Sequence, residues 1–346
     1  MKIAIWDNGA FNYKGKKEAG EVAAKLITAK TDIYFPFVIW CGDISYRSGI
    51  LKGKKGKKDF LGPMIKEAGK NRIEVHPVIG FGAAGIGYFD NRRNYRSSAP
   101  WSEINKKWKW DKYVLDKWVC PSWEENREKT LKVVKELIDN YDVDGIHLDF
   151  MRYPNATEVL VEHPCECEAC KRARLICLGK ERLSKAELAD PGVQFLEAKY
   201  RNRFIREFVI AVRAITKPKG LKVSLAARNY LPMASWKAYA VLEGQDWVEW
   251  CREGLLDFVC PMTYTTSLKY FQTWMHQFQG LTKNLPVKLY EGIGKRSSAG
   301  MITRAQMINQ AKAAKDRKAG GITIFQLNAL DDGDLQALAQ FKGEEN

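Results

Sequence analysis

The hydrophobic residues of this chain follow two alternating periods, and the alternation repeats along its whole length. Apolar runs of five to nine residues, rich in Val, Ile and aromatic residues, have the length and composition of buried strands. Each run is followed by a stretch in which apolar residues recur every three or four positions, the period of an amphipathic helix. The predicted strands are residues 2–6, 32–40, 73–81, 143–150, 221–228, 256–264, 287–294 and 321–327.

One predicted helix follows each strand. The helices are expected at residues 20–30, 61–70, 122–141 and 192–216 and around Trp247, Trp274, Met307 and Leu338. Ser122 precedes the third helix, and Glu125 stands three residues later, as in a capping box. Eight strands that each precede a helix predict a (β/α)8 TIM barrel, an α/β fold. The alternative is an open doubly wound sheet, but "DNGAFNYKGK" after the first strand is not its glycine-rich phosphate turn.

Two predicted connections are too long for ordinary barrel loops. Residues 82–121 form the first connection, and residues 151–190, which contain "CECEAC", form the second. A chain of 346 residues can bury the core of one large barrel. We therefore predict a single catalytic domain over residues 1–346, with a Cys-rich insertion at residues 151–190 inside it.

Composition and charge limit the classes of partner. Hydrophobic residues make up 45% of the chain and charged residues 28%, which is typical of a globular protein. The formal net charge of +15 favours an anionic partner such as an acidic polysaccharide, although a solvated basic surface would give the same number. No nucleic-acid-binding motif is present, so no nucleic-acid partner is expected. The sequence does not indicate an oligomeric state.

The expected location of the protein is the cytoplasm, with no membrane partner. No apolar run approaches the roughly 18 residues that a membrane-spanning helix needs. The start, "MKIAIWDNGAF", has too short an apolar run for a signal peptide. A chain trimmed of its leader would look the same, so secretion stays open.

Polar residues gather where the predicted strands end. Active sites of TIM barrels lie at the C-terminal ends of the strands. His147 and Asp149 lie two residues apart in the fourth strand and therefore project to the same side. A carboxylate in an apolar strand costs several kcal/mol unless it has a partner, so Asp149 is either structural or chemical. The residues expected to contact substrate are Asp7, Trp40, Asp43, His147, Arg152, Arg228, Asn229, Tyr264 and Gln326.

The catalytic candidates are Asp149 and Glu291. Glu291 is the only acid at the end of the seventh strand, which lies across a TIM barrel from the fourth. Two carboxylates about 5 to 9 Å apart are what glycoside hydrolysis needs. Arg152, His147 and Arg228 would orient the carboxylates and lower the pKa of the ionised one. The simpler alternatives are a salt bridge from Asp149 to an arginine and a loop-anchoring role for Glu291.

The stretch "CPSWEENREKTLKVVKELIDNYDVDGIHLDFMRYP" resembles the signature of glycosyl-hydrolase-like family 10. The segments "DIYFPFVIWCGDISYRSG" and "DFVCPMTY" resemble the same family, so the similarity covers most of the barrel. The resemblance implies a TIM barrel that acts on glycans, including peptidoglycan-derived chains, and makes Asp149 the best catalytic candidate. The run "DGIHLD" is also similar to family 18 chitinases. Their motif needs a glutamate where this chain has Met151, so a chitinase-type mechanism is not expected.

Similarity to other barrel glycosidases leaves two role assignments open. Asp149 would be the general acid/base with Glu291 as nucleophile, or Asp149 would be the nucleophile as in amylase-like enzymes. The sequence does not choose between them, nor between retention and inversion of the anomeric centre. It also does not identify the sugar or the linkage.

A cysteine cluster predicts a metal site. Cys165, Cys167 and Cys170 form C-x-C-x-x-C, a grouping that suits a closed tetrahedral zinc site with four protein ligands. The candidates for the fourth ligand are Cys120, His163 and Cys177. Resemblance to the cysteine cluster of family 42 β-galactosidases favours Cys120. Reduced cysteines without a metal are the alternative, and no organic cofactor is expected.

The sequence therefore predicts a glycoside hydrolase that cleaves O-glycosyl bonds of a polysaccharide or oligosaccharide. An anionic or cell-wall glycan is the favoured substrate, and a structural zinc ion is expected. The alternative from another class is a basic TIM barrel that binds glycans without cleaving them.

Overall fold

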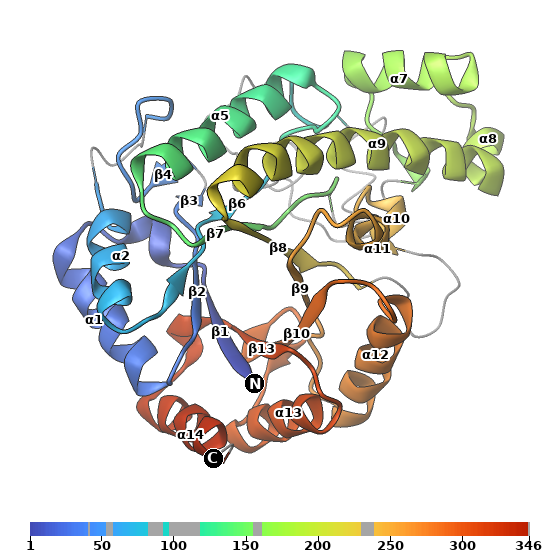
Figure 1. The fold of residues 1–346 in the computed structure, drawn as a ribbon. Helices are drawn as coiled ribbons and strands as arrows, with labels where there is room; N and C mark the ends of the chain where they lie inside the picture. The colour runs from blue at the N-terminus through green and yellow to red at the C-terminus, as the bar shows by residue number, and fades with distance from the viewer. Residues whose placement is uncertain are drawn as a thin grey trace.

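Figure 1 shows the computed structural model, which describes residues 1–40, 42–52, 58–81, 93–96, 118–154, 161–229 and 239–344. Parallel strands surround the centre of the molecule, and helices lie outside them. The strands of this sheet are β1 (Lys2–Asp7), β2 (Ile33–Pro36), β5 (Glu74–Val75), β6 (Val78–Ile79), β7 (Gly145–Leu148), β8 (Lys222–Ala227), β9 (Phe258–Pro261), β10 (Lys288–Gly294) and β13 (Gly321–Phe325).

The sheet closes into a barrel through its third strand. The spatial order is β5-β2-β1-β13-β10-β9-β8-β7-β6, and neighbouring strands pair in parallel. β5 and β6 are separated only by His76 and Pro77, so they are the two halves of one strand. Proline has no N–H to donate to the ladder, which accounts for the interruption. The nine segments are thus eight barrel strands, and the predicted (β/α)8 fold is confirmed.

A helix follows each barrel strand on the outside of the ring (Figure 1). The helices are α1 (Lys16–Thr28), α2 (Leu61–Lys70), α5 (Glu124–Asn140), α7 (Glu168–Leu178), α8 (Lys185–Ala189), α9 (Pro191–Thr216), α10 (Tyr239–Leu242), α11 (Trp247–Arg252), α12 (Leu268–Leu281), α13 (Arg304–Asp316) and α14 (Asp332–Gly343). Short 3-10 turns cover Ala10–Asn12, Lys217–Lys219 and Leu327–Ala329. Two small hairpins, β3 (Ile39–Trp40) with β4 (Asp43–Ile44) and β11 (Arg296–Ser297) with β12 (Gly300–Met301), complete the described elements.

The segment before α5 differs from its prediction. The helix begins at Glu124 with Trp123 as its N-cap, so the predicted cap by Ser122 is wrong. The Ser122 hydroxyl is instead 2.5 Å from the hydroxyl of Tyr153 and 3.1 Å from the sulfur of Cys170. These tertiary contacts keep the side chain away from the helix N–H groups.

The alternation of side chains along the strands produces two apolar layers. One layer fills the barrel and includes Trp6, Phe35 and Tyr290. The other lies between the strands and the helices and includes Leu289 and Ile293. Because residues 289, 290 and 293 all belong to β10, their layers define which of its side chains face inward.

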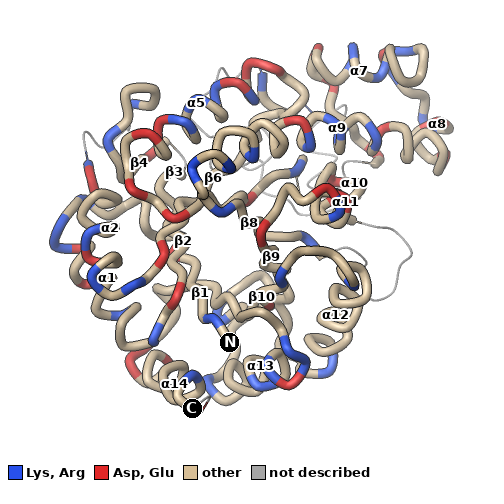
Figure 2. Tube along the Cα trace, in the orientation of Figure 1, with Lys and Arg blue, Asp and Glu red and all other residues tan. Residues whose placement is uncertain are grey.

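Charges of both signs are interspersed along the outer helices, for example along α5 and α9 (Figure 2). In the part of the chain that the structure describes, no helix is long and apolar enough to cross a membrane.

Candidate active site

A pocket of about 110 Å³ lies at the C-terminal ends of the barrel strands. Its lining residues are Trp6, Asn8, Phe37, Trp40, Asp149, Phe150, Arg152, Ala226, Met262, Tyr264 and Phe325. Most of this surface is aromatic, and Asn8, Asp149 and Arg152 supply polar groups. Aromatic walls with a few placed polar groups are typical of ligand sites.

Asp149 is the residue directly after β7, and its side chain is buried, with 6% of the residue exposed. Its Oδ1 accepts a hydrogen bond from the Phe150 N–H at 2.6 Å and an ion-paired hydrogen bond from Arg152 Nη1 at 3.3 Å. Burial raises the pKa of Asp149 above its ordinary value, against the opposing effects of the Arg152 charge and the two hydrogen bonds. A carboxyl that keeps its proton to higher pH is suited to general acid catalysis.

The backbone around Asp149 is unusual. Phe150 has a φ of +53°, a left-handed conformation that bulky residues rarely adopt. Gly80 lies so close on the neighbouring strand that a Cβ there would be 1.9 Å from the Asp149 carbonyl oxygen. Strained backbone of this kind is concentrated at functional sites, where the surrounding structure enforces it.

His147 lies beneath the pocket rather than in its wall. Its Nε2 accepts a hydrogen bond from Trp6 Nε1 at 2.9 Å, so the proton is on Nδ1, which donates to Ser224 Oγ at 2.8 Å. Burial holds the pKa of His147 well below 6.5, so the ring is neutral. His147 therefore supports Trp6, a lining residue, and carries no charge with which to orient a carboxylate.

The structure does not bring Glu291 to Asp149. Glu291 is two residues from both Leu289 and Ile293 in β10, so the three side chains point to the same side of the strand. Glu291 also pairs in register with Ile322 of the outer layer. Its side chain therefore faces the helices, where Oε2 accepts a hydrogen bond from Thr263 Oγ1 at 3.2 Å. Burial raises the pKa of Glu291 to about 8. Glu291 is absent from the lining of the Asp149 pocket.

Asp7 and Arg228, two of the predicted substrate contacts, lie outside the pocket. The Asp7 side chain points outward from the end of β1. Its carboxylate accepts hydrogen bonds from the Tyr34 hydroxyl at 2.7 Å and the Gly9 N–H at 3.0 Å. Burial raises the pKa of Asp7, as expected for an enclosed carboxyl. Arg228 pairs with the buried Glu243 at 3.0 Å. These contacts give both residues structural partners.

The other predicted contacts divide into two groups. Trp40, Arg152 and Tyr264 line the pocket, and Asp43, Asn229 and Gln326 do not. Asp43 pairs with Trp40 across the β3–β4 hairpin, and Gln326 directly follows Phe325, so both adjoin lining residues.

Sequence reasoning missed the apolar part of the pocket. The apolar lining residues look like ordinary strand residues in the sequence, and only their inward-pointing positions at the strand ends distinguish them. They are Trp6, Phe37, Ala226, Met262 and Phe325. The sequence signal that could have identified them is their position at the level of Asp149 on the neighbouring predicted strands.

The four predicted metal ligands come together. Cys120 Sγ lies 3.6 Å from Cys170 Sγ, 3.7 Å from Cys167 Sγ and 3.9 Å from Cys165 Sγ. All four sulfurs are buried and within 4.8 Å of one another. Tetrahedral zinc with Zn–S bonds of about 2.3 Å requires sulfurs about 3.8 Å apart. The geometry therefore fits a single metal ion, and the cluster does not include His163 or Cys177.

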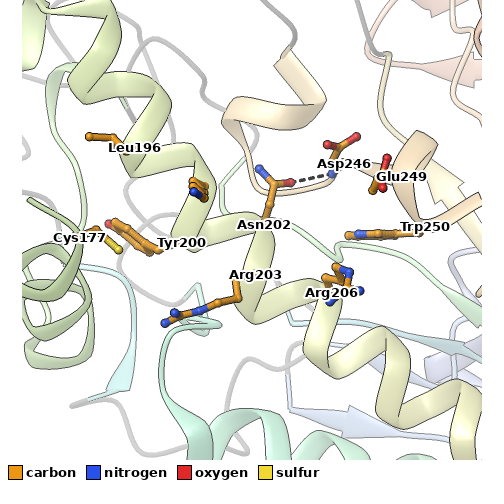
Figure 3. Close-up of a pocket in the computed structure, with 10 residues that line it drawn as sticks. Cys177, Leu196, Tyr200, Asn202, Arg203, Arg206, Asp246, Glu249 and Trp250 are labelled. Carbon is orange, nitrogen blue, oxygen red and sulfur yellow. Dashed lines mark hydrogen bonds between the residues drawn. The ribbon is translucent and has the colours of Figure 1, made fainter. Parts of the chain in front are cut away.

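A larger cavity of about 530 Å³ lies outside the barrel, between α9 and α11 (Figure 3). Arg203 and Arg206 of α9 line one wall, and Asp246 and Glu249 line the other. The Asn202 Oδ1 accepts a hydrogen bond from the Asp246 N–H at 2.8 Å across the cavity edge. Among the residues that the structure describes, this cavity and the Asp149 pocket have no lining residue in common.

Comparisons with known proteins agree with this architecture. The model of the family "Glycosyl hydrolase-like 10" matches residues 36–308. A curated S-layer-related protein from Niallia circulans is 26% identical over 182 residues, a match that takes in 44% of this chain and 11% of that protein. The chain thus spans about a tenth of the curated relative that it matches.

Solved structures of glycosidases share the fold. The glycoside hydrolase domain of PgaB (BpsB) from Bordetella bronchiseptica has a TM-score of 0.70 at 12% identity, over 99% of this chain and 95% of that one. The catalytic domain of β-amylase from Paenibacillus polymyxa has a TM-score of 0.62 at 10% identity, over 99% and 97%. A GH18 chitinase from Pseudoalteromonas aurantia has a TM-score of 0.54 at 13% identity, over 99% and 100%.

Proposed function

The chain belongs to the glycosyl hydrolase-like 10 family, and we propose that it hydrolyses O-glycosyl bonds with Asp149 as the proton donor. The observation that supports this role most is the position of Asp149, a buried carboxyl at the C-terminal strand ends in an aromatic pocket. Raising the pKa of such a carboxyl keeps it protonated for transfer to a leaving oxygen.

The contacts of Asp149 suggest how it acts. In the described part of the chain, both hydrogen bonds to this carboxyl reach Oδ1, from Phe150 N–H and Arg152 Nη1. Oδ2 is therefore the oxygen that would carry the proton. Transfer of this proton to the glycosidic oxygen accompanies cleavage of the bond to the anomeric carbon, and water supplies the hydroxyl group that replaces the leaving sugar. The other proton of that water is released to the solvent, from which the Asp149 carboxylate takes up a proton again.

The proposed substrate is an anionic or cell-wall glycan. The formal net charge of +15 would attract an acidic polymer to the protein. The aromatic rings of Trp40 and Tyr264 would line the bound sugar, because both belong to the pocket wall.

One observation favours a second candidate function, a barrel that binds glycans without cleaving them. The pocket volume of about 110 Å³ is small, because ligand pockets usually measure about 300 to 1,000 Å³. In this alternative the strand ends would bind a single chain terminus, and Asp149 would be a structural partner of Arg152.

One panel of glycans distinguishes the two functions. Acidic, amino-sugar and neutral polymers are incubated with the protein and with Asp149→Asn, and both binding and new reducing ends are measured. Hydrolysis supports the first function if it occurs in the original protein and is lost in the variant. Binding without new reducing ends from acid to neutral pH would support the second.

We also propose that Cys120, Cys165, Cys167 and Cys170 bind one structural zinc ion. Zinc would link the segment before α5, which carries Cys120, to the insertion after β7, which carries the other three cysteines. Four thiolates leave no open coordination position, so a direct catalytic role is not proposed. Metal content of protein purified without a chelator is the direct measurement.

A further inference from the structure

The segment before α5 contacts both the cysteine cluster and the loop that carries Arg152. Trp118 Nε1 donates a hydrogen bond to the Arg152 carbonyl oxygen at 3.2 Å. The Trp118 ring also meets the Phe150 ring edge-on, with 5.8 Å between centroids. Trp118 is 1% exposed and Arg152 is 3% exposed, so the contact is enclosed. Two residues later in the chain is Cys120, which belongs to the cluster.

A second contact follows two residues further. The Ser122 hydroxyl is 2.5 Å from the Tyr153 hydroxyl and 3.1 Å from Cys170 Sγ. Tyr153 directly follows Arg152 and is fully buried. Residues 118, 120 and 122 thus contact, in turn, the Arg152 backbone, the cysteine cluster and the Tyr153 side chain.

The loop that these contacts hold is the one that positions the Asp149 partner. Arg152 Nη1 is 3.3 Å from Asp149 Oδ1, and its guanidinium lies over the Phe150 ring at 4.8 Å. A shift of the Arg152 backbone would move the guanidinium relative to the carboxylate, because Arg152 lies three positions after Asp149 in the chain.

We propose that the cysteine cluster positions the active site through Trp118. A metal ion bound to the four thiols fixes residues 118–122, and Trp118 and Ser122 then hold Arg152 and Tyr153. The Arg152 guanidinium is thereby kept beside the Asp149 carboxylate. Trp118 and Tyr153 are positioning residues, since neither is assigned a contact with the reacting atoms. The inference rests on the proposed role of Asp149 and on the proposed zinc.

The acidity of Asp149 reports whether the guanidinium is in place. The Arg152 charge lowers the pKa of Asp149 against the larger effect of burial, so loss of this contact raises that pKa. Among the described residues, Tyr264 is a further titratable group that interacts with Asp149, and burial holds the pKa of Tyr264 well above 10, so its hydroxyl stays neutral. His147, beneath the pocket, is neutral as well.

The first test replaces Trp118 with Phe, which removes the Nε1 donor and keeps a ring beside Phe150. The free energy of unfolding is measured against pH for each protein and for its Asp149→Asn derivative. The difference between the two curves reports the titration of Asp149 without any substrate. In Trp118→Phe this titration should move up by about one pH unit, because a contacting opposite charge contributes about 1 to 3 units.

A matched control is available in the same segment. Trp123 is the N-cap of α5, and its indole lies 5.7 Å from the Arg93 guanidinium instead of contacting Arg152. Trp123→Phe should leave the Asp149 titration in place. Tyr153→Phe, which keeps the ring and removes only the hydroxyl beside Ser122, should give a smaller upward shift and serves if Trp118→Phe does not fold.

The second test addresses the metal. Zinc removal from the original protein should shift the Asp149 titration upward as Trp118→Phe does, and zinc removal from Trp118→Phe should add little. Three results would each overturn the inference. They are a zinc content well below one equivalent, an Asp149 titration that is unchanged in Trp118→Phe and Tyr153→Phe, and a shift in Trp123→Phe equal to that in Trp118→Phe. An absence of hydrolysis together with the expected shifts would remove the proposed hydrolase function and leave the positioning role intact.

Discussion

Asp149 and Glu291 face opposite sides of the barrel wall. Asp149 lines the pocket at the strand ends, whereas Glu291 lies in the outer apolar layer, where Thr263 donates a hydrogen bond to it. Both side chains are buried, and burial raises the pKa of both. The same physical effect therefore acts on one carboxyl that lines a pocket and on another that packs against helices.

The proposed chemistry predicts different outcomes for the two carboxyls. Asp149→Asn should reduce kcat by about 10²- to 10⁴-fold, the usual contribution of a general acid, with folding retained. Glu291→Gln is the matched control, and its activity should stay within a few-fold of the original. Reducing-end release measures both. A large loss in Glu291→Gln at unchanged stability would restore Glu291 to the mechanism.

Glu291 should make stability depend on pH. The folded-state pKa of about 8 lies above the ordinary value of 4.5, so the folded protein binds more protons between these values than the unfolded chain. The contribution is fully present below about pH 4.5 and is lost as pH rises through about 8. Glu291→Gln should therefore raise the melting temperature more at pH 8 than at pH 5, as followed by circular dichroism. Equal effects at the two pH values would contradict this assignment.

The pH dependence of hydrolysis should reveal Asp149. Because its protonated form donates the proton, kcat/KM should fall as pH rises through a pKa above the ordinary 3.8. Arg152→Gln removes the charge that lowers this pKa, so the alkaline limb should move to higher pH. The expected movement is about 1 unit or more. An alkaline limb that stays in place would show that Arg152 does not set the acidity of the catalytic group.

Zinc removal should destabilise the protein. The native protein should contain one equivalent of zinc, and chelation or Cys167→Ser should lower the melting temperature while residual activity survives at low temperature. Cys177→Ser is the matched control, because Cys177 is a half-buried thiol outside the cluster. If Cys167→Ser and Cys177→Ser have equal effects, the cluster has no special role.

Salt should weaken activity on acidic substrates. Exposed charges are screened as ionic strength rises to about 0.5 M, so hydrolysis of an acidic polymer should decline while hydrolysis of a neutral one changes little. Initial rates on the two polymers across a salt series give the comparison. Parallel rates at every salt concentration would show that the positive net charge does not select the substrate.

The order of the helices and strands, and the polar residues at the strand ends, could be predicted from the amino-acid sequence alone. The two hydrophobic periods predicted eight strand–helix units, and the position of Asp149 near the end of the fourth predicted strand predicted its place at the C-terminal end of the barrel. The spacing of Cys165, Cys167 and Cys170 predicted a thiol cluster. These features are local, so a short stretch of sequence is enough to specify them.

Which side chains contact one another could not be predicted without the three-dimensional fold. Strands of a parallel barrel are buried on both faces, so the inward and outward positions of "KLYEGIG" are both apolar and the alternation does not reveal the direction of Glu291. Likewise, Ser122 has the sequence of a helix cap, yet packing against Tyr153 and Cys170 directs it elsewhere. Parity and partner choice depend on residues far apart in the chain, because the free energy of burial is gained only when those distant surfaces come together.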